Sequence, residues 1–337
     1  MLALIDPLFA DHDPGAGHPE RPERIWTLLH MLEKFPARGE IQFVAPRRGT
    51  WDEAAWIHSG NYLERLKESS GSRVVLDPDT RTSPDSIETA LAAAGSVLAV
   101  AEKVNAAARP GFAMIRPPGH HAERDKAMGF CFLNNVAVAA EWALRRAGAQ
   151  RVAIIDFDVH HGNGTQHSFY DRDDVLYISS HQFPYYPGTG ALEETGVGKG
   201  QGFTVNFPLK AGTGDEAFTR IYQDLVPAIL EQYRPDWLFI SAGYDAHRDD
   251  PLAQLEISEQ GFARVVQSLQ RCGQFCKGRV VYVLEGGYNL EALAASVRTS
   301  LEVILGKLSP SDEPLPEPEG WKQYLAAVRR AHGTWGL

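Results

Sequence analysis

Short apolar runs alternate with longer, helix-like segments along most of the chain. The runs are four or five residues long, several are rich in Val and Ile, and they lie at residues 112–115, 152–155, 175–179, 237–241 and 280–284. Apolar runs of this length are typical of buried parallel strands. The segments between them have helical length and regularly spaced apolar positions, as at 134–147, 215–232 and 258–276.

This alternation predicts an α/β fold with three layers, in which helices cover both faces of a central, mostly parallel sheet. The 337 residues, 44% of them hydrophobic, suffice for a sizeable core, and α/β folds of this length often form one domain. The Pro- and acid-rich stretch 309–320 predicts an extended linker before a short helix at 321–331. We therefore expect one domain over residues 1–307 and a peripheral tail, 308–337, packed on or beside it.

Charge and cysteine content exclude some partners. The formal net charge of −10 opposes direct binding to nucleic acid and is compatible with cationic substrates such as lysine-rich peptides or polyamines. No apolar run approaches the roughly 20 residues that span a bilayer, and the N-terminus has no secretory pattern. Cys131, Cys272 and Cys276 form no C-x-x-C pair, so we expect buried thiols in a cytoplasmic protein.

Four of the predicted strands are followed directly by loops rich in His, Asp or Tyr. The loops are RPPGHH after 112–115, DFDVHHGNG after 152–155, AGYDAH after 237–241 and EGGYN after 280–284. In open α/β sheets, ligands bind outside the carboxyl ends of the strands. We therefore expect the polar side chains of these four loops to form one site.

Asp158 and His160 lie two residues apart at a strand end. In an extended segment such positions point the same way, so both side chains can converge on one ion, with Asp245 from a neighbouring strand end as the third ligand. Two carboxylates and one imidazole with an open position fit catalytic zinc, although iron(II) or cobalt would also fit. Taken alone, Asp-x-His is more often a solvated turn, and the other three polar loops favour the metal site.

The adjacent His120 and His121 follow a stiff Pro-Pro-Gly turn. A metallohydrolase needs a base to take a proton from the attacking water and an acid to protonate the leaving amine, and two imidazoles can supply both. Asp156 and Asn163 are natural partners for the second ring nitrogens. A carboxylate partner favours the imidazolium, whereas an amide leaves its histidine closer to neutral.

Tyrosine and phenylalanine side chains complete the predicted site. Tyr288 follows two glycines that let its hydroxyl approach a developing oxyanion, although a tyrosine here could instead cap the edge of the sheet. Phe130 and Tyr186 lie in glycine-containing loops and could line a narrow apolar tunnel for a methylene stem, although isolated aromatic residues are more often part of a core.

The motifs RPPGHH, GFCFLNN, DFDVHHGNG, LYISSHQF, PGTG, SAGYDAH and LEGGY together resemble the zinc-dependent histone deacetylase family of the arginase–deacetylase superfamily. The resemblance covers roughly residues 11–306. Asn163, GFCFLNN and HPERPERI resemble class II members and their bacterial relatives, the histone deacetylase-like amidohydrolases. Tyr288 stands where some weakly active class II members carry His, which implies a competent catalyst.

The resemblance implies the arginase–deacetylase fold, with residues 1–307 as one catalytic domain. It implies one zinc ion per chain, held by Asp158, His160 and Asp245. It implies that His120 and His121 form the catalytic pair, His120 partnered by Asp156 and His121 by Asn163. Tyr288 would polarise the amide carbonyl.

Substrate and potassium sites also follow from the resemblance. The acyl-lysine tunnel would be lined by Gly129, Phe130 and Tyr186, the last in place of the more usual Phe, with Asp79 as the rim acid. Leu252 stands where polyamine-selective relatives can carry Glu, which argues against polyamine selectivity. Structural potassium ions would be bound at an inner site by Asp156, Asp158, His160, Ser179 and Ser180, and at an outer site by Phe169, Arg172 and Val175.

The predicted function is zinc-dependent hydrolysis of the amide of acetyl-lysine, in a peptide or protein, or of a similar acylated amine. One alternative is hydrolysis of acetylpolyamines or other small acylated amines. Another is an acyl-lysine binding module with little turnover, against which Tyr288 and the metal triad speak. A two-metal ureohydrolase would need extra carboxylates where His120 and His121 stand. The sequence gives no indication of an oligomeric state.

Overall fold

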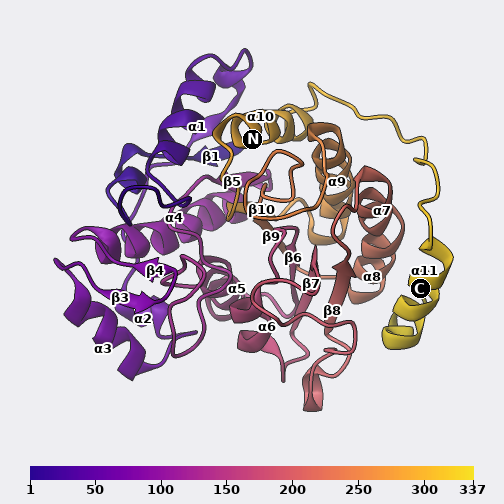
Figure 1. The fold of residues 1–337 in the computed structure, drawn as a ribbon, viewed down its shortest axis with the longest axis horizontal. Coiled ribbons are helices and arrows are strands. Elements are labelled where there is room, and N and C mark those ends of the chain that lie inside the picture. Colours follow the sequence, from indigo (N-terminus) through magenta and orange to yellow (C-terminus); the bar gives the residue numbers. More distant parts are fainter.

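The computed structural model describes residues 1–337, and at its centre lies an eight-stranded sheet (Figure 1). Every neighbouring pair of strands in this sheet is parallel. The predicted α/β class and parallel sheet are confirmed. From one edge to the other the strands are β2 (Gln42–Phe43), β1 (Leu2–Leu4), β5 (Gly111–Ala113), β10 (Val280–Leu284), β9 (Trp237–Ala242), β6 (Val152–Asp156), β7 (Val175–Gln182) and β8 (Thr204–Leu209).

The sheet separates two apolar cores, because successive side chains of a strand point to opposite faces. In β10, Val281 and Val283 lie in one core and Tyr282 and Leu284 in the other. The first core is covered by α4 (Ser86–Ala107) and α5 (Asn135–Arg146). The second is covered by α1 (Glu23–Glu33), α8 (Val226–Tyr233), α9 (Glu259–Cys272) and α10 (Leu290–Ile304). The predicted three-layer arrangement is therefore present.

Several predicted boundaries differ in the structure, two of them near the site or its supporting helices. The segment 215–232 is not one helix but α7 (Asp215–Arg220), a π-helical turn (Ile221–Leu225) and α8. Pro227 lies in the first turn of α8, and because it lacks an N–H the regular hydrogen-bond ladder cannot continue through it. The strand predicted at 112–115 ends earlier, at Ala113.

Smaller elements lie beside α4. They are α2 (Trp51–Ala54), α3 (Gly60–Ser69) and the antiparallel hairpin of β3 (Val75–Asp77) and β4 (Thr80–Arg81), all at the lower left of Figure 1. Leu63 and Leu66 of α3 pack with Leu91 of α4 in a third, smaller core. None of the helices combines the length and the apolar character that crossing a membrane requires.

The C-terminal segment passes around the outside of the molecule. After α10 the chain runs extended past α9 and α7 to α11 (Trp321–Ala331), which lies beside β8 and α8 (Figure 1). Arg220 donates to the carbonyl of Leu315 (2.7 Å), which ties this segment to α7. Trp321 and Trp335 are buried in the larger core.

The carboxyl ends of the parallel strands all lie at one edge of the sheet. Asp156, the last residue of β6, is level with Ser179 of β7 on one side and Ser241 of β9 on the other. The end of β10, Leu284, is level with Ala242 of β9. The polar loops that follow β5, β6, β9 and β10 therefore meet at this edge, and α6 (Asn163–Phe169) begins there.

Candidate active site

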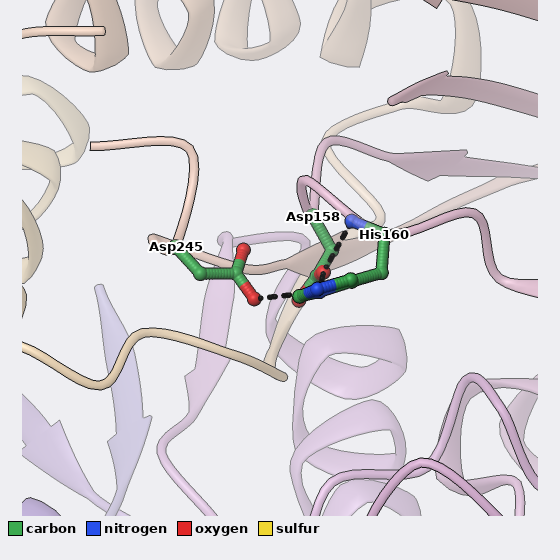
Figure 2. Close-up of side chains that lie close together, drawn as sticks. All are labelled: Asp158, His160 and Asp245. Atoms are coloured by element: carbon green, nitrogen blue, oxygen red, sulfur yellow. Dashed lines mark hydrogen bonds and ion pairs between the residues drawn. The ribbon is translucent and has the colours of Figure 1, made fainter. Parts of the chain in front are cut away.

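Asp158, His160 and Asp245 converge at the carboxyl edge of the sheet (Figure 2). Nδ1 of His160 lies 3.2 Å from a carboxylate oxygen of Asp158 and 3.2 Å from one of Asp245. One ligand atom from each residue lies within 4.8 Å of the others, and all three side chains are buried. This set of one nitrogen and two oxygen donors fits a single divalent cation such as zinc.

Backbone amides hold both carboxylates in place. The N–H of Val159 donates to Asp245 (3.0 Å), and the N–H of Gly286 donates to Asp158 (2.8 Å). A Cβ at Gly286 would lie 2.0 Å from an oxygen of Asp245, so this position has no room for a side chain. The loop after β10 thus supports ligands from the loops after β6 and β9.

The cluster retains protons when no cation is bound. Burial opposes the imidazolium of His160, but its hydrogen bonds to Asp158 and Asp245 outweigh this effect and raise its pKa to about 10. Burial and the charge of Asp158 raise the pKa of Asp245 to about 7. A divalent cation would take the place of these protons.

His120 and His121, in the loop after β5, have two different partners. Nδ1 of His120 lies 3.1 Å from a carboxylate oxygen of Asp156, whereas Nδ1 of His121 lies 2.7 Å from the amide oxygen of Asn163. The two imidazole rings are 4.0 Å apart between centroids. Nε2 of His120 is 3.8 Å from Asp158, so the pair lies against the proposed metal ligands.

The two histidines differ in charge. Burial disfavours the charged form of His120, but the carboxylates of Asp158 and Asp156 overcome it and raise its pKa to about 10. Burial, together with His120 and His160, holds the pKa of His121 well below its usual value. These shifts favour the imidazolium at His120 and the neutral ring at His121.

Tyr288 is held at the end of a glycine turn. Gly287 has φ +119°, a conformation that residues with a side chain rarely adopt, and the N–H of Tyr288 donates to Asp250 (2.7 Å). Burial, and then the negative charge of Asp245, raise the pKa of the Tyr288 hydroxyl well above its usual value. The hydroxyl is therefore uncharged and can donate a hydrogen bond.

A cavity of about 200 Å³ reaches this site. Its lining includes His121, His160 and Tyr288. All five residues expected to contact substrate also line it: Asp79, Gly129, Phe130, Tyr186 and Leu252.

Tyr185 also lines the cavity, and the sequence interpretation missed it. Its ring stacks on that of His160 with centroids 5.9 Å apart, and its hydroxyl donates to the carbonyl of Leu252 (2.6 Å). The only signal in the sequence was its position beside Tyr186 in YYPGTG.

Two buried charged residues that the sequence interpretation also missed support the loops. Arg24 of α1 donates to the carbonyls of Gly287 (2.7 Å) and Glu285 (2.5 Å). The Glu285 carboxylate accepts from the N–H of Gly119 (2.6 Å) and His120 (3.2 Å). Arg24 lies in the motif HPERPERI, which indicated the family resemblance but no role for this arginine.

The proposed potassium ligands lie close together in the fold. Asp156 and Ser179 are adjacent across β6 and β7, and Ser180 shares a hydrogen bond with Tyr222 (2.5 Å). At the expected outer site, the N–H of Arg172 donates to the carbonyl of Phe169 (3.1 Å). Val175, the third residue expected there, begins β7.

Comparison with known proteins identifies the family of the chain. The sequence model of the histone deacetylase domain matches residues 18–304. The chain belongs to the histone deacetylase family. This membership makes it a hydrolase of the deacetylase type, and the resemblance stated from the sequence motifs is confirmed.

Two relatives of this histone deacetylase family member, from an archaeon and a bacterium, match it over most of their length. It is 38% identical to a probable deacetylase of Archaeoglobus fulgidus over 96% of this chain and 90% of that protein. It is 37% identical to the histone deacetylase-like amidohydrolase of Pseudomonas aeruginosa over 94% and 84% of the two chains. The crystal structure of the HDA15 HD domain superposes with a TM-score of 0.91 and 35% identity, covering 99% and 95%.

Proposed function

We propose that this member of the histone deacetylase family is a zinc-dependent deacylase that hydrolyses the amide of acetyl-lysine or of a similar acylated amine. The observation that carries the proposal is the Asp158–His160–Asp245 cluster, which lies against His120 and His121. Of these five residues, His121 and His160 line the cavity. Carboxylate and imidazole donors suit one zinc ion, and when bound it would polarise the amide carbonyl and lower the pKa of water.

The side chains around the cluster have complementary tasks. His121, kept neutral by burial and by its charged neighbours, can take a proton from the attacking water. A histidine of the pair then protonates the departing lysine amine, giving a free amine and a carboxylate. The uncharged hydroxyl of Tyr288 can donate to the oxygen of the amide as negative charge develops on it.

The cavity walls fit the stem of an acyl-lysine. Phe130 packs edge-on to Tyr288, with ring centroids 5.7 Å apart, and Leu252 adds an apolar side chain. Aromatic and aliphatic walls favour methylene groups over charged ones. Leu252 therefore weighs against acetylpolyamines, whose chains carry further ammonium groups.

Structural potassium and a cytoplasmic location remain part of the proposal. The potassium ions would bind beside Asp156 and Ser179, which are level across β6 and β7, and beside Phe169 and Arg172, which share a backbone hydrogen bond. We propose that residues 1–307 form the catalytic domain and that residues 308–337 add to its core through Trp321 and Trp335.

Two variants test the proposed roles on an acetyl-lysine peptide. We expect Tyr288→Phe to abolish turnover while one metal ion per chain is retained, and Asp158→Ala to abolish both turnover and metal binding. Metal content is measured on the same samples as acetate release, and circular dichroism checks that the variants are folded. Full activity in either variant would refute the role assigned to that residue.

A further inference from the structure

The carboxylate of Glu123, two residues after His121, contacts the side chain that partners this histidine. Its Oε1 accepts from the amide Nδ2 of Asn163 (2.5 Å) and from Nδ1 of His167 (2.8 Å). Nδ2 of Asn163 has two further neighbours, the carbonyl of His121 and the sulfur of Met128, both at 3.5 Å, and these groups also accept hydrogen bonds. All three contacts of Nδ2 are therefore with acceptors.

The position of Glu123 is fixed from both sides of its peptide backbone. Nδ1 of His58 lies 2.8 Å from the Glu123 carbonyl, and the N–H of Glu123 donates to the carbonyl of Lys126 (2.9 Å). His58 is buried, and its Nε2 accepts from the N–H of Asn134, the N-cap residue of α5 (3.0 Å). The acceptor that faces Asn163 is therefore held by the surrounding fold.

The orientation of the Asn163 amide determines which nitrogen of His121 carries a proton. With Nδ2 toward Glu123, the amide oxygen lies 2.7 Å from Nδ1 of His121, and because this oxygen only accepts, Nδ1 carries the proton. In the neutral ring the lone pair is then on Nε2, the nitrogen that Asn163 leaves free. A reversed amide would place an N–H against Nδ1 and favour the opposite tautomer, in which Nε2 cannot accept a proton.

We propose that Glu123 is a positioning residue that sets the tautomer of His121 through the amide of Asn163. The inference rests on the proposed deacylase function, in which His121 takes a proton from the attacking water. A carboxylate at position 123 favours one orientation of the amide, because a reversed amide would set the Asn163 oxygen against the Glu123 oxygen and leave both without a donor. Glu123 thus keeps the base ready to accept a proton, although it does not line the cavity.

The tautomer can be measured on zinc-loaded protein that carries ¹⁵N-labelled histidine. The ¹⁵N shifts distinguish protonated from unprotonated ring nitrogens, and the His121 signals are those that disappear in His121→Ala. At slightly alkaline pH we expect a proton on Nδ1 alone in the wild type. In Glu123→Gln we expect a mixture of both tautomers, because the new amide can either accept from Asn163 or donate to it. Any other protonation of His121 in the wild type, or an unchanged tautomer in Glu123→Gln, would overturn the inference.

Turnover of an acetyl-lysine peptide tests the same contact by rescue. For Glu123→Gln we expect kcat to fall by about 3–10-fold with KM unchanged, because the preference that one hydrogen bond gives to the active tautomer is lost. Asn163→Asp should cost more, since it sets two carboxylates against each other. Combining both substitutions should raise kcat by about tenfold above that of Asn163→Asp, because the new amide can donate to the new carboxylate.

Glu53→Gln is the matched control, since the Glu53 side chain is 17% exposed, against 21% for Glu123, and its partners are Arg47 and Thr50. We expect it to leave kcat unchanged. Bound zinc and urea unfolding are measured on every variant, which separates loss of positioning from loss of the fold.

Two kinetic outcomes would overturn the inference alone: a wild-type kcat in Glu123→Gln, or a double variant no faster than Asn163→Asp. A zinc-loaded wild type that hydrolyses no acetyl-lysine peptide would instead overturn the proposed function. The tautomer measurement needs no turnover, so it would still decide whether Glu123 orients Asn163.

Discussion

The guanidinium carbon of Arg24 lies 5.0 Å from the centroid of the Tyr288 ring. The same side chain binds the carbonyls of Glu285 and Gly287 and forms a buried ion pair with Glu20 (2.9 Å). Helix α1, from the start of the chain, therefore fixes the turn that presents Tyr288. The tyrosine depends on this support, because Gly286 and Gly287 provide no side-chain packing of their own.

Arg24→Ala should separate support of Tyr288 from binding of the metal. We expect kcat to fall by about tenfold or more because the hydroxyl is misplaced, while one metal ion per chain remains. The free energy of unfolding should fall by about 3 kcal/mol, since Glu20 loses one of its buried partners. Acetate release, metal analysis and urea unfolding measure these effects. Arg298→Ala removes a half-exposed arginine of α10 as a control, and an unchanged kcat in Arg24→Ala would contradict the assignment.

Glu285 should prove to be a positioning residue for His120. It is fully buried and also accepts from the Ser241 hydroxyl (3.0 Å). Glu285→Ala leaves these donors unpaired, so we expect a loss of about 2–3 kcal/mol in unfolding free energy together with lower turnover. Glu285→Gln should keep most of the stability and most of the turnover. The glutamine amide oxygen can still accept from the N–H groups of Gly119 and His120, and the Ser241 hydroxyl can rotate to accept from the glutamine amide N–H. Equal damage in the Gln and Ala variants would argue against this role.

Zinc affinity should increase with pH. Burial lowers the pKa of His160, but Asp158 and Asp245 raise it to about 10, so the metal-free imidazole is protonated at neutral pH. A cation needs the neutral ring, and binding therefore releases a proton. Between about pH 6 and pH 8 we expect the affinity to rise by roughly tenfold per pH unit for each proton released. Competition with a chelator measures this slope, and a flat profile would exclude His160 as a ligand.

Trp335→Ala tests whether the C-terminal segment is part of the folded core. The Trp335 ring packs edge-on to Phe203 (5.8 Å) and Tyr233 (6.2 Å), and its Nε1 donates to Gly202 (2.8 Å). We expect a loss of about 3–5 kcal/mol in unfolding free energy, with turnover retained at low temperature. Trp26→Ala, at a half-exposed position, should have little effect. A Trp335→Ala protein as stable as wild type would mean that the tail is only peripheral.

Features encoded by neighbouring residues could be predicted from the sequence. Apolar runs identified five of the eight sheet strands, and Asp158 and His160 stand together because of their spacing along an extended segment. The start of α9 is also encoded by neighbouring residues, because the Ser258 hydroxyl accepts from the N–H of Gly261 (3.2 Å). Each of these features depends on residues only a few positions apart.

Features that depend on distant contacts could not be predicted in this way. Arg24 meets carbonyls of the turn after β10, and Glu285 meets amides of the loop after β5, contacts that no local pattern encodes. Tyr185 acquires its place only when its loop folds over His160. The break in the segment 215–232 has a local cause, because Pro227 lacks the N–H that a continuous helix requires there.

Stepwise addition of zinc to metal-free protein tests the central claim most directly. Acetate release from an acetyl-lysine peptide is measured at each step, together with bound metal. We predict no release without metal and a linear rise that stops at one zinc ion per chain. Hydrolysis that persists without metal, or that rises until two ions are bound, would contradict a single catalytic cation held by Asp158, His160 and Asp245.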